Sequence, residues 1–290
     1  MPPEAPSDAH VPEGAAFLNL VWGQEDACQR ETDGRLPAMG KKAPACLGQV
    51  GTVLSLLDRM ASCWWACQGG DHVIEYLCGR VASTGRAALR LMRFGFYDES
   101  LVLSRSIGEI ANLFLLFQED RHAFGEWKVA SRGDRLREFS PVKVRLRLEE
   151  LGTAPPISQE RYTLLSERAS HAHPATKPQA HNLLHLPMAG ATFQEEGLLV
   201  CLNELAVALS LATAFGCLNL DVEKDFKHRI FASAEHLAQQ IGGAAITEID
   251  EYHRHVLANP AAREAIERAA DDFKRLQAER RHRFDGRDAV

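Results

Sequence analysis

The sequence predicts an all-α protein, an antiparallel helical bundle core with extra C-terminal helices. Apolar residues recur at spacings of three and four along most of the chain, which is the period of a helix with one buried face. The stretch from Asp98 to Asp120 is apolar on nearly every side, as expected for a helix at the centre of a bundle. No stretch of any length alternates with the period of a strand, and no repeat of solenoid length is present.

The chain divides into three parts by composition. Residues 1–45 are rich in Pro, Gly, Ala and charge and predict a flexible N-terminal arm, of which Ala15–Trp22 can dock on the body. Residues 46–258 predict the helical bundle domain, and residues 259–290 a charged C-terminal helix that is an exposed appendage or contacts a protein partner. We expect the main helices over residues 46–67, 72–94, 98–120, 158–173, 195–215, 225–241 and 246–258.

Composition and charge narrow the class of protein. The chain is 46% hydrophobic and 25% charged, with a formal net charge of −6, which is ordinary for a soluble globular protein and gives no general attraction to nucleic acid or anionic membrane. The N-terminus lacks the pattern of a signal peptide, and polar residues interrupt the longest apolar runs. We therefore expect a cytoplasmic protein with no membrane segment.

The seven cysteines are scattered and odd in number, which favours a reducing compartment. Cys63 and Cys67 are one helical turn apart, and we expect no second cysteine pair or nearby histidine to complete a tetrahedral metal site with them. We interpret both as core residues.

One segment is locally basic despite the negative net charge. Its residues are Arg132, Arg135, Arg137, Lys143, Arg145 and Arg147. Such charge runs are usually solvated faces, and the functional alternative is a patch that faces phosphate groups.

The central helix carries one polar stripe. Arg105 and Glu109 are four residues apart, so their side chains can meet, and Asp98 and Asn112 lie within about 40° of Arg105 around the helix axis. One interpretation is an internal ion pair that fixes the helix register. The other is a polar site between helices, where bundle proteins place their active groups.

The predicted helix over residues 158–173 carries the other candidate chemical groups. Pro174 ends it and leaves His173 at the helix terminus. A histidine can act as base or acid near neutral pH, and an arginine can hold a scissile phosphate, so the two residue types suit RNA cleavage by the 2′-hydroxyl without a metal. Two polar stripes run along this helix, one formed by Ser166, Ser170 and His173, the other by Arg168 and His171.

The segment RASHAH, from Arg168 to His173, resembles the Arg-x4-His motif of HEPN domains. These domains are small helical bundles of prokaryotic toxin, antiphage and RNA-processing systems, and many are metal-independent endoribonucleases. The resemblance implies that Arg168 and His173 or His171 are catalytic, that RNA is the partner, and that a homodimer brings two motifs to one cleft. No cofactor is implied.

A second resemblance rests on the pairing of an R-x3-E helix with a later Y-x3-S…H helix. Such pairs are found in a group of bacterial helical domains without an assigned activity, and the likeness covers about residues 72–216. The residues that carry it are Arg105, Glu109, Tyr162, Ser166 and His171. Together with Asn112 and Ser170, which lie on the two polar stripes, Arg105, Glu109, Tyr162 and Ser166 are the expected supporting site residues.

Other interpretations of the histidines stay open. His171 and His173 can cap the C-terminal end of the helix, where a cation interacts well with the helix dipole. Together with His181 and His185 they form H-x-H-x7-H-x3-H, to which Glu109 could add an oxygen ligand for zinc or iron, although the paired Glu-x-x-His motifs of di-iron bundles are absent. The alternative function is a non-catalytic binding or sensing module.

Overall fold

The computed structural model describes residues 14–64, 70–167, 177–182, 186–188 and 190–241, together with scattered positions between 258 and 275. Within these residues the chain is helical and has no strand, which confirms the predicted all-α class. The helices are α1 (Gly14–Arg35), η1 (Leu36–Ala38), α2 (Lys42–Ala61), α3 (Val73–Arg93), α4 (Tyr97–Glu119), α5 (Arg121–Val129), α6 (Arg132–Glu138), α7 (Pro141–Glu150), α8 (Gln159–Leu165), α9 (Glu195–Leu218) and α10 (Lys224–Ile241).

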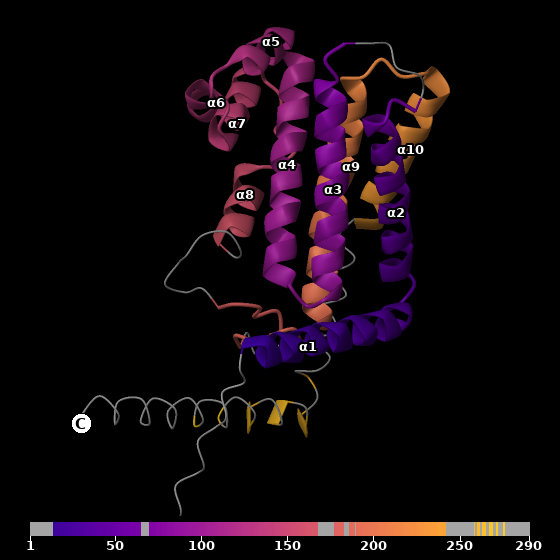
Figure 1. The fold of residues 1–290 in the computed structure, drawn as a ribbon, viewed down its shortest axis with the longest axis vertical. Helices are drawn as coiled ribbons and strands as arrows, with labels where there is room; N and C mark the ends of the chain where they lie inside the picture. Colours follow the sequence, from indigo (N-terminus) through magenta and orange to yellow (C-terminus); the bar gives the residue numbers. More distant parts are fainter. Residues whose placement is uncertain are drawn as a thin grey trace, which may run out of the picture.

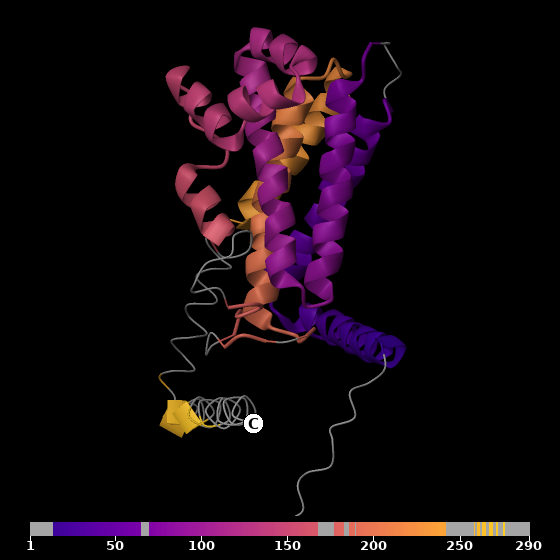
Figure 2. The ribbon, with the colours of Figure 1, turned by 60° about the vertical axis from the view of Figure 1, so that its left-hand side comes forward.

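Five long helices, α2, α3, α4, α9 and α10, stand side by side and form the bundle (Figures 1 and 2). The pairs joined by short connections, such as α3 and α4, are antiparallel, as predicted. In contrast, α4 and α9 run in the same direction. Tyr97 lies against Gly197 at one end of the pair, and Asn219 donates a hydrogen bond of 2.8 Å to the carbonyl of Phe114 at the other. The segment from α5 to α9 returns the chain and permits this parallel packing.

The core lies where α4 and α9 meet α2, α3 and α10. Both central helices are long and apolar enough to cross a membrane, and 61% of the apolar window of each is buried inside the bundle, as in the core helix of a soluble protein. Among the largest fully buried side chains are Leu57, Met60, Met92, Leu101, Ile107, Phe114, Phe117, Leu205 and Phe226.

The structure differs from the predicted flexible arm from Gly14 onward, where the chain forms α1 across one end of the bundle (Figure 1). Asp33 forms an ion pair with Arg93 at 2.6 Å, and the Thr32 hydroxyl donates to the Arg93 carbonyl at 3.2 Å. Only Cys28 and Thr32 of this helix are buried. A helix with so narrow a contact has little apolar periodicity, which is why its sequence does not indicate it.

The short helices α5, α6, α7 and α8 form a second layer on one side of α4 (Figure 2). Asp120 begins α5 by accepting hydrogen bonds from the backbone N–H of His122 and Ala123 at 3.0 and 3.1 Å, and Arg147 of α7 reaches it at 2.7 Å. Burial acts to raise the pKa of Asp120, but these hydrogen bonds outweigh it and hold the pKa below its usual value. Apolar contacts complete the layer through Leu115, Leu116, Ala123, Val144 and Leu148.

The predicted helices over residues 246–258 and 259–290 lie outside the described residues, apart from isolated helical positions.

Candidate functional site

The polar stripe of α4 faces α8, and its central residue is Arg105. The Arg105 guanidinium pairs with the Glu109 carboxylate at 3.0 Å and donates a hydrogen bond of 2.7 Å to the hydroxyl of Tyr162. Its central carbon lies 4.4 Å from the centre of the Tyr162 ring. The side chains of Arg105 and Glu109 are 15% and 29% exposed to solvent. The predicted ion pair is therefore present, but it is only partly buried.

A second guanidinium, that of Arg145 on α7, lies over the same tyrosine ring at 4.4 Å. Arg145 is only 2% exposed, and it donates a hydrogen bond to the side-chain carbonyl of Gln159. Its Nη1 has no hydrogen-bond partner, and no described carboxylate pairs with it. Contact with an aromatic face offsets about 0.5–2 kcal/mol of the cost of burying a cation, which is several kcal/mol for an unpaired charge.

A third arginine directly precedes Tyr162 on α8. Arg161 of α8 pairs with Glu204 of α9 at 2.8 Å, and its side chain is 30% exposed. We call Arg105, Arg145, Arg161 and Tyr162 the arginine–tyrosine cluster. Its three guanidinium groups face two carboxylates, those of Glu109 and Glu204, which leaves one positive charge in a partly buried setting. Such a setting attracts an anion more strongly than an exposed charge does, because water screens it less.

Asn112 positions the chain that leads into α8. Its side-chain amide exchanges two hydrogen bonds with the backbone of Ile157, at 3.2 and 2.8 Å. Ile157 lies directly over Gly108 of α4, where an added Cβ would stand 2.6 Å from the isoleucine side chain. Asn112 is therefore a positioning residue, and glycine at 108 is what allows this close approach.

The start of α8 matches the prediction, because the Ser158 side chain accepts from the backbone N–H of Arg161 at 3.3 Å. The Ser166 hydroxyl donates to the carbonyl of Tyr162 at 2.7 Å, so it is used within its own helix turn. Arg168, Ser170, His171 and His173 lie outside the described residues. They follow α8 directly in sequence, with Arg168 six residues after Tyr162.

The structure separates two members of the metal set that the sequence suggested. His181 pairs with Asp98 at 2.7 Å, at the beginning of α4. Glu109 is eleven residues further along, about 16 Å at the rise of an α-helix, so the two cannot share one ion. His185 lies outside the described residues. The loop that carries His181 instead caps α4, because the Gln179 side chain accepts the backbone N–H of Tyr97 at 2.8 Å.

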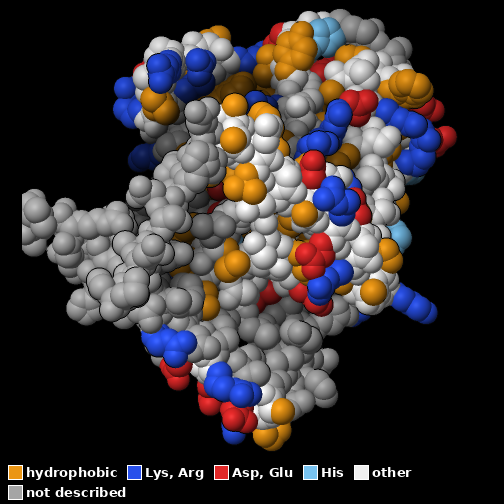
Figure 3. All heavy atoms as spheres, turned by 60° about the horizontal axis from the view of Figure 1, so that its bottom comes forward, with side chains coloured by type: hydrophobic (Ala, Val, Ile, Leu, Met, Phe, Trp, Pro, Cys, Tyr) orange, Lys and Arg blue, Asp and Glu red, His pale blue; other side chains and the backbone are white. Residues whose placement is uncertain are grey.

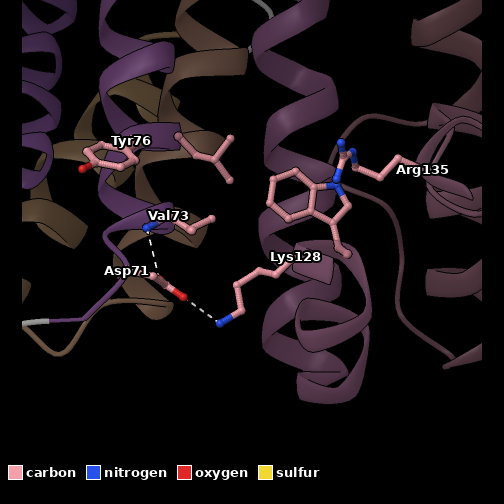
Figure 4. Close-up of a pocket in the computed structure, with 7 residues that line it drawn as sticks. Asp71, Val73, Tyr76, Lys128 and Arg135 are labelled. Carbon is pink, nitrogen blue, oxygen red and sulfur yellow. Dashed lines mark hydrogen bonds and ion pairs between the residues drawn. The ribbon is translucent and has the colours of Figure 1, made fainter. Parts of the chain in front are cut away.

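A pocket of about 520 Å³ opens between the start of α3 and helices α5 and α6 (Figure 4). Tyr76 and Arg135 lie on opposite sides of it, and the ion pair between Asp71 and Lys128, at 2.7 Å, closes one end. Trp127 adds a second aromatic side chain to the lining. Aromatic and cationic groups at one opening suit a flat, anionic ligand.

Two of the six basic residues in the segment around α6 and α7 form ion pairs with described carboxylates. Arg137 pairs with Asp134 at 2.6 Å and with Glu138 at 2.7 Å, and Arg147 pairs with Asp120 at 2.7 Å. Lys and Arg side chains gather at the upper left of Figure 3, the side on which α6 and α7 lie in Figure 1. Arg132, Arg137 and Lys143 are exposed, which agrees with a solvated face for most of the segment, and Arg145 is its buried exception.

Comparison of the chain with protein-family models, with curated proteins and with solved structures found no match.

Proposed function

We propose that the protein is a metal-independent endoribonuclease of a toxin or antiphage system, in which the arginine–tyrosine cluster binds an RNA phosphate. One observation supports this above the others: Arg145 is buried, carries a charge that no described carboxylate neutralises, and has an unsatisfied N–H. A buried cation of this kind costs stability and is expected where an anion binds.

The cluster would receive the phosphate at its exposed side, through Arg105 and Arg161, with the charge of Arg145 beneath them. Cleavage would use Arg168 with His173 or His171. The RNA 2′-hydroxyl attacks the neighbouring phosphorus and gives its proton to the histidine. The bond from phosphorus to the 5′-oxygen breaks, and that oxygen takes a proton from the other histidine or from water. Arg168 offsets the charge that develops on the phosphate oxygens.

Three further expectations belong to this proposal. The protein works in the cytoplasm and without attachment to a membrane. It forms a homodimer, whose molecular mass can be measured by sedimentation analysis. The dimer brings two copies of residues 168–173 to one cleft. The charged segment over residues 259–290 contacts a protein partner.

The test is an RNA-cleavage assay in EDTA, with tRNA and total RNA as substrates. Wild type is compared with His173→Ala, His171→Ala and Arg168→Ala, and Arg35→Ala, an exposed arginine on α1, is the matched control. We expect cleavage by wild type and the control, and loss of cleavage in at least one of the three variants at an unchanged melting temperature. A substrate with 2′-deoxyribose at the cleaved position should resist. Equal cleavage by every variant, or none by wild type, removes the nuclease proposal.

A second candidate function is a non-catalytic binding or sensing module, and the pocket of Figure 4 favours it. Its aromatic and charged lining fits a nucleotide-sized anion. Because Trp127 lines the pocket, such a ligand should quench its fluorescence, and Tyr76→Ala should weaken the effect. Saturable quenching together with an absence of RNA cleavage would favour this second function.

A further inference from the structure

Three metal-ligating side chains meet at the connection between α2 and α3, at the opposite end of the bundle from α1 (Figure 1). The Cys63 sulfur lies 3.6 Å from Nδ1 of His72 and 3.7 Å from Oε1 of Glu75. His72 Nδ1 and Glu75 Oε1 are 3.4 Å apart. All three residues are partly buried. This group is separate from the arginine–tyrosine cluster and from His181, which lies at the beginning of α4.

The three distances match one face of a zinc coordination tetrahedron. With Zn–S near 2.3 Å and Zn–N and Zn–O near 2.1 Å, tetrahedral angles place sulfur and nitrogen about 3.6 Å apart, sulfur and oxygen about 3.6 Å apart, and nitrogen and oxygen about 3.4 Å apart. The observed separations are 3.6, 3.7 and 3.4 Å. Three protein ligands leave the fourth position of the tetrahedron for water or another donor.

The arrangement does not fit a catalytic Cys-His-Glu triad. In a triad the nucleophile and the carboxylate contact different nitrogens of the imidazole, so that a proton can pass across the ring. Here the Cys63 sulfur and the Glu75 carboxylate both lie next to the same nitrogen, Nδ1 of His72. Donor atoms that converge on one point in this way are arranged as ligands of one ion.

The backbone holds two of these side chains in place. Cys63 and His72 both have left-handed backbone conformations, with φ of +50° and +52°, which non-glycine residues seldom adopt. Cys63 follows the C-cap residue of α2 and His72 precedes α3, so these two left-handed residues bring their side chains toward Glu75 in the first turn of α3. The prediction that Cys63 packs in the core is wrong, because the residue lies in this turn at intermediate burial.

We propose that Cys63, His72 and Glu75 bind one Zn²⁺ ion, which fastens the end of α2 to the start of α3. Thiolate, imidazole and carboxylate together are ligands that zinc prefers, whereas calcium and magnesium select oxygen ligands alone. The site also adjoins the pocket of Figure 4, because Asp71 and Val73 flank His72 in the chain and the Tyr76 ring lies 6.1 Å from the imidazole.

The first test measures zinc bound to the purified full-length chain after dialysis against a zinc-buffered solution. We expect one tightly held zinc per wild-type chain. Loss of a direct ligand should weaken binding more than about 100-fold, because loss of an outer-shell partner alone weakens it about 10–100-fold. The variants are Cys63→Ala, His72→Ala and Glu75→Gln. His122→Ala, an exposed histidine on α5, is the matched control and should bind zinc as wild type does.

A second measurement identifies the ligand directly. Cobalt in place of zinc should give a thiolate-to-cobalt charge-transfer band that Cys63→Ser abolishes. This readout keeps the proposal testable if one alanine variant fails to fold. An absence of tightly bound zinc, equal zinc in all variants, or a cobalt spectrum unchanged by Cys63→Ser would overturn the proposal. None of these variants touches the arginine–tyrosine cluster, so zinc binding and RNA cleavage can fail separately.

Discussion

Replacing Arg145 by methionine separates the stability of this fold from its proposed function. The substitution removes the contact with the Tyr162 ring, about 1 kcal/mol, and a hydrogen bond from a charged donor to Gln159, about 2 kcal/mol. It also removes two unfavourable features. One is a buried charge, which costs several kcal/mol, and the other is a buried N–H group without a hydrogen-bond acceptor, which costs about 1–3 kcal/mol. We expect the variant to be as stable as wild type or up to about 2 kcal/mol more stable.

The matched control is Arg161→Met, in which the lost arginine does have a carboxylate partner. Glu204 would be left with 13% of its side chain exposed and no cation beside it, which should destabilise the protein by about 1–2 kcal/mol after allowance for solvent. At about 2–4 °C per kcal/mol, calorimetry at pH 7 should show an equal or higher melting temperature for Arg145→Met and a lower one for Arg161→Met.

RNA binding gives the second readout of the same pair. If Arg145 helps neutralise a phosphate, Arg145→Met should weaken RNA binding and reduce the slope of log affinity against log salt by about one, measured by fluorescence anisotropy. A melting temperature for Arg145→Met as low as that of Arg161→Met would refute the reasoning, because it would mean that the folded protein neutralises the Arg145 charge internally.

Three other perturbations test the surroundings of the cluster. Gly108→Ala should destabilise the protein by about 1–3 kcal/mol in urea unfolding, because its methyl group would overlap Ile157; a gain in stability, which helix propensity alone would give, contradicts this. Tyr162→Phe should cost about 1 kcal/mol by the same method through loss of the hydrogen bond from Arg105, and no change would mean that water replaces the hydroxyl. The lowered pKa of Asp120 contributes stability that is present above the unfolded-state pKa of about 4 and is lost as pH falls through the lower folded-state pKa, so Asp120→Asn should reduce the fall in melting temperature below about pH 4.

Sequence periodicity predicts local geometry well and contacts between distant segments poorly. The Arg105–Glu109 pair is confirmed, because helix geometry alone brings residues four apart together. Arg105 and Tyr162, which are in contact, lie 57 residues apart in the chain. Only the family resemblance indicated that their two helices belong together. Arg145 belongs to a run of basic residues of the kind that is usually exposed to solvent. Nothing in the neighbouring sequence indicates that α7 buries this one arginine.

The zinc ligands show a different limit. If the predicted helix over residues 46–67 continued through Cys63 and Cys67, the two cysteines would lie one turn apart and His72 would lie too far along the chain to join them. In the structure α2 ends at Ala61, and the left-handed conformations of Cys63 and His72 accompany a separation of 3.6 Å between the Cys63 sulfur and Nδ1 of His72. Left-handed conformations are expected at glycine, so their occurrence at a cysteine and a histidine gives no signal in the sequence.

The position of the cluster follows from the packing of α4. Along the middle of α4 the other faces pack against α3 and α9, and the Arg105–Glu109 pair lies on the side toward α7 and α8. On that side Gly108 and Asn112 fix Ile157, and Ile157 immediately precedes α8. The same contacts therefore set the place of Tyr162 and of the chain that enters residues 168–173. A change that loosens α8 must alter the arginine–tyrosine cluster and the entry to the candidate catalytic segment together, whereas a change at His72, the residue before α3, should leave both intact.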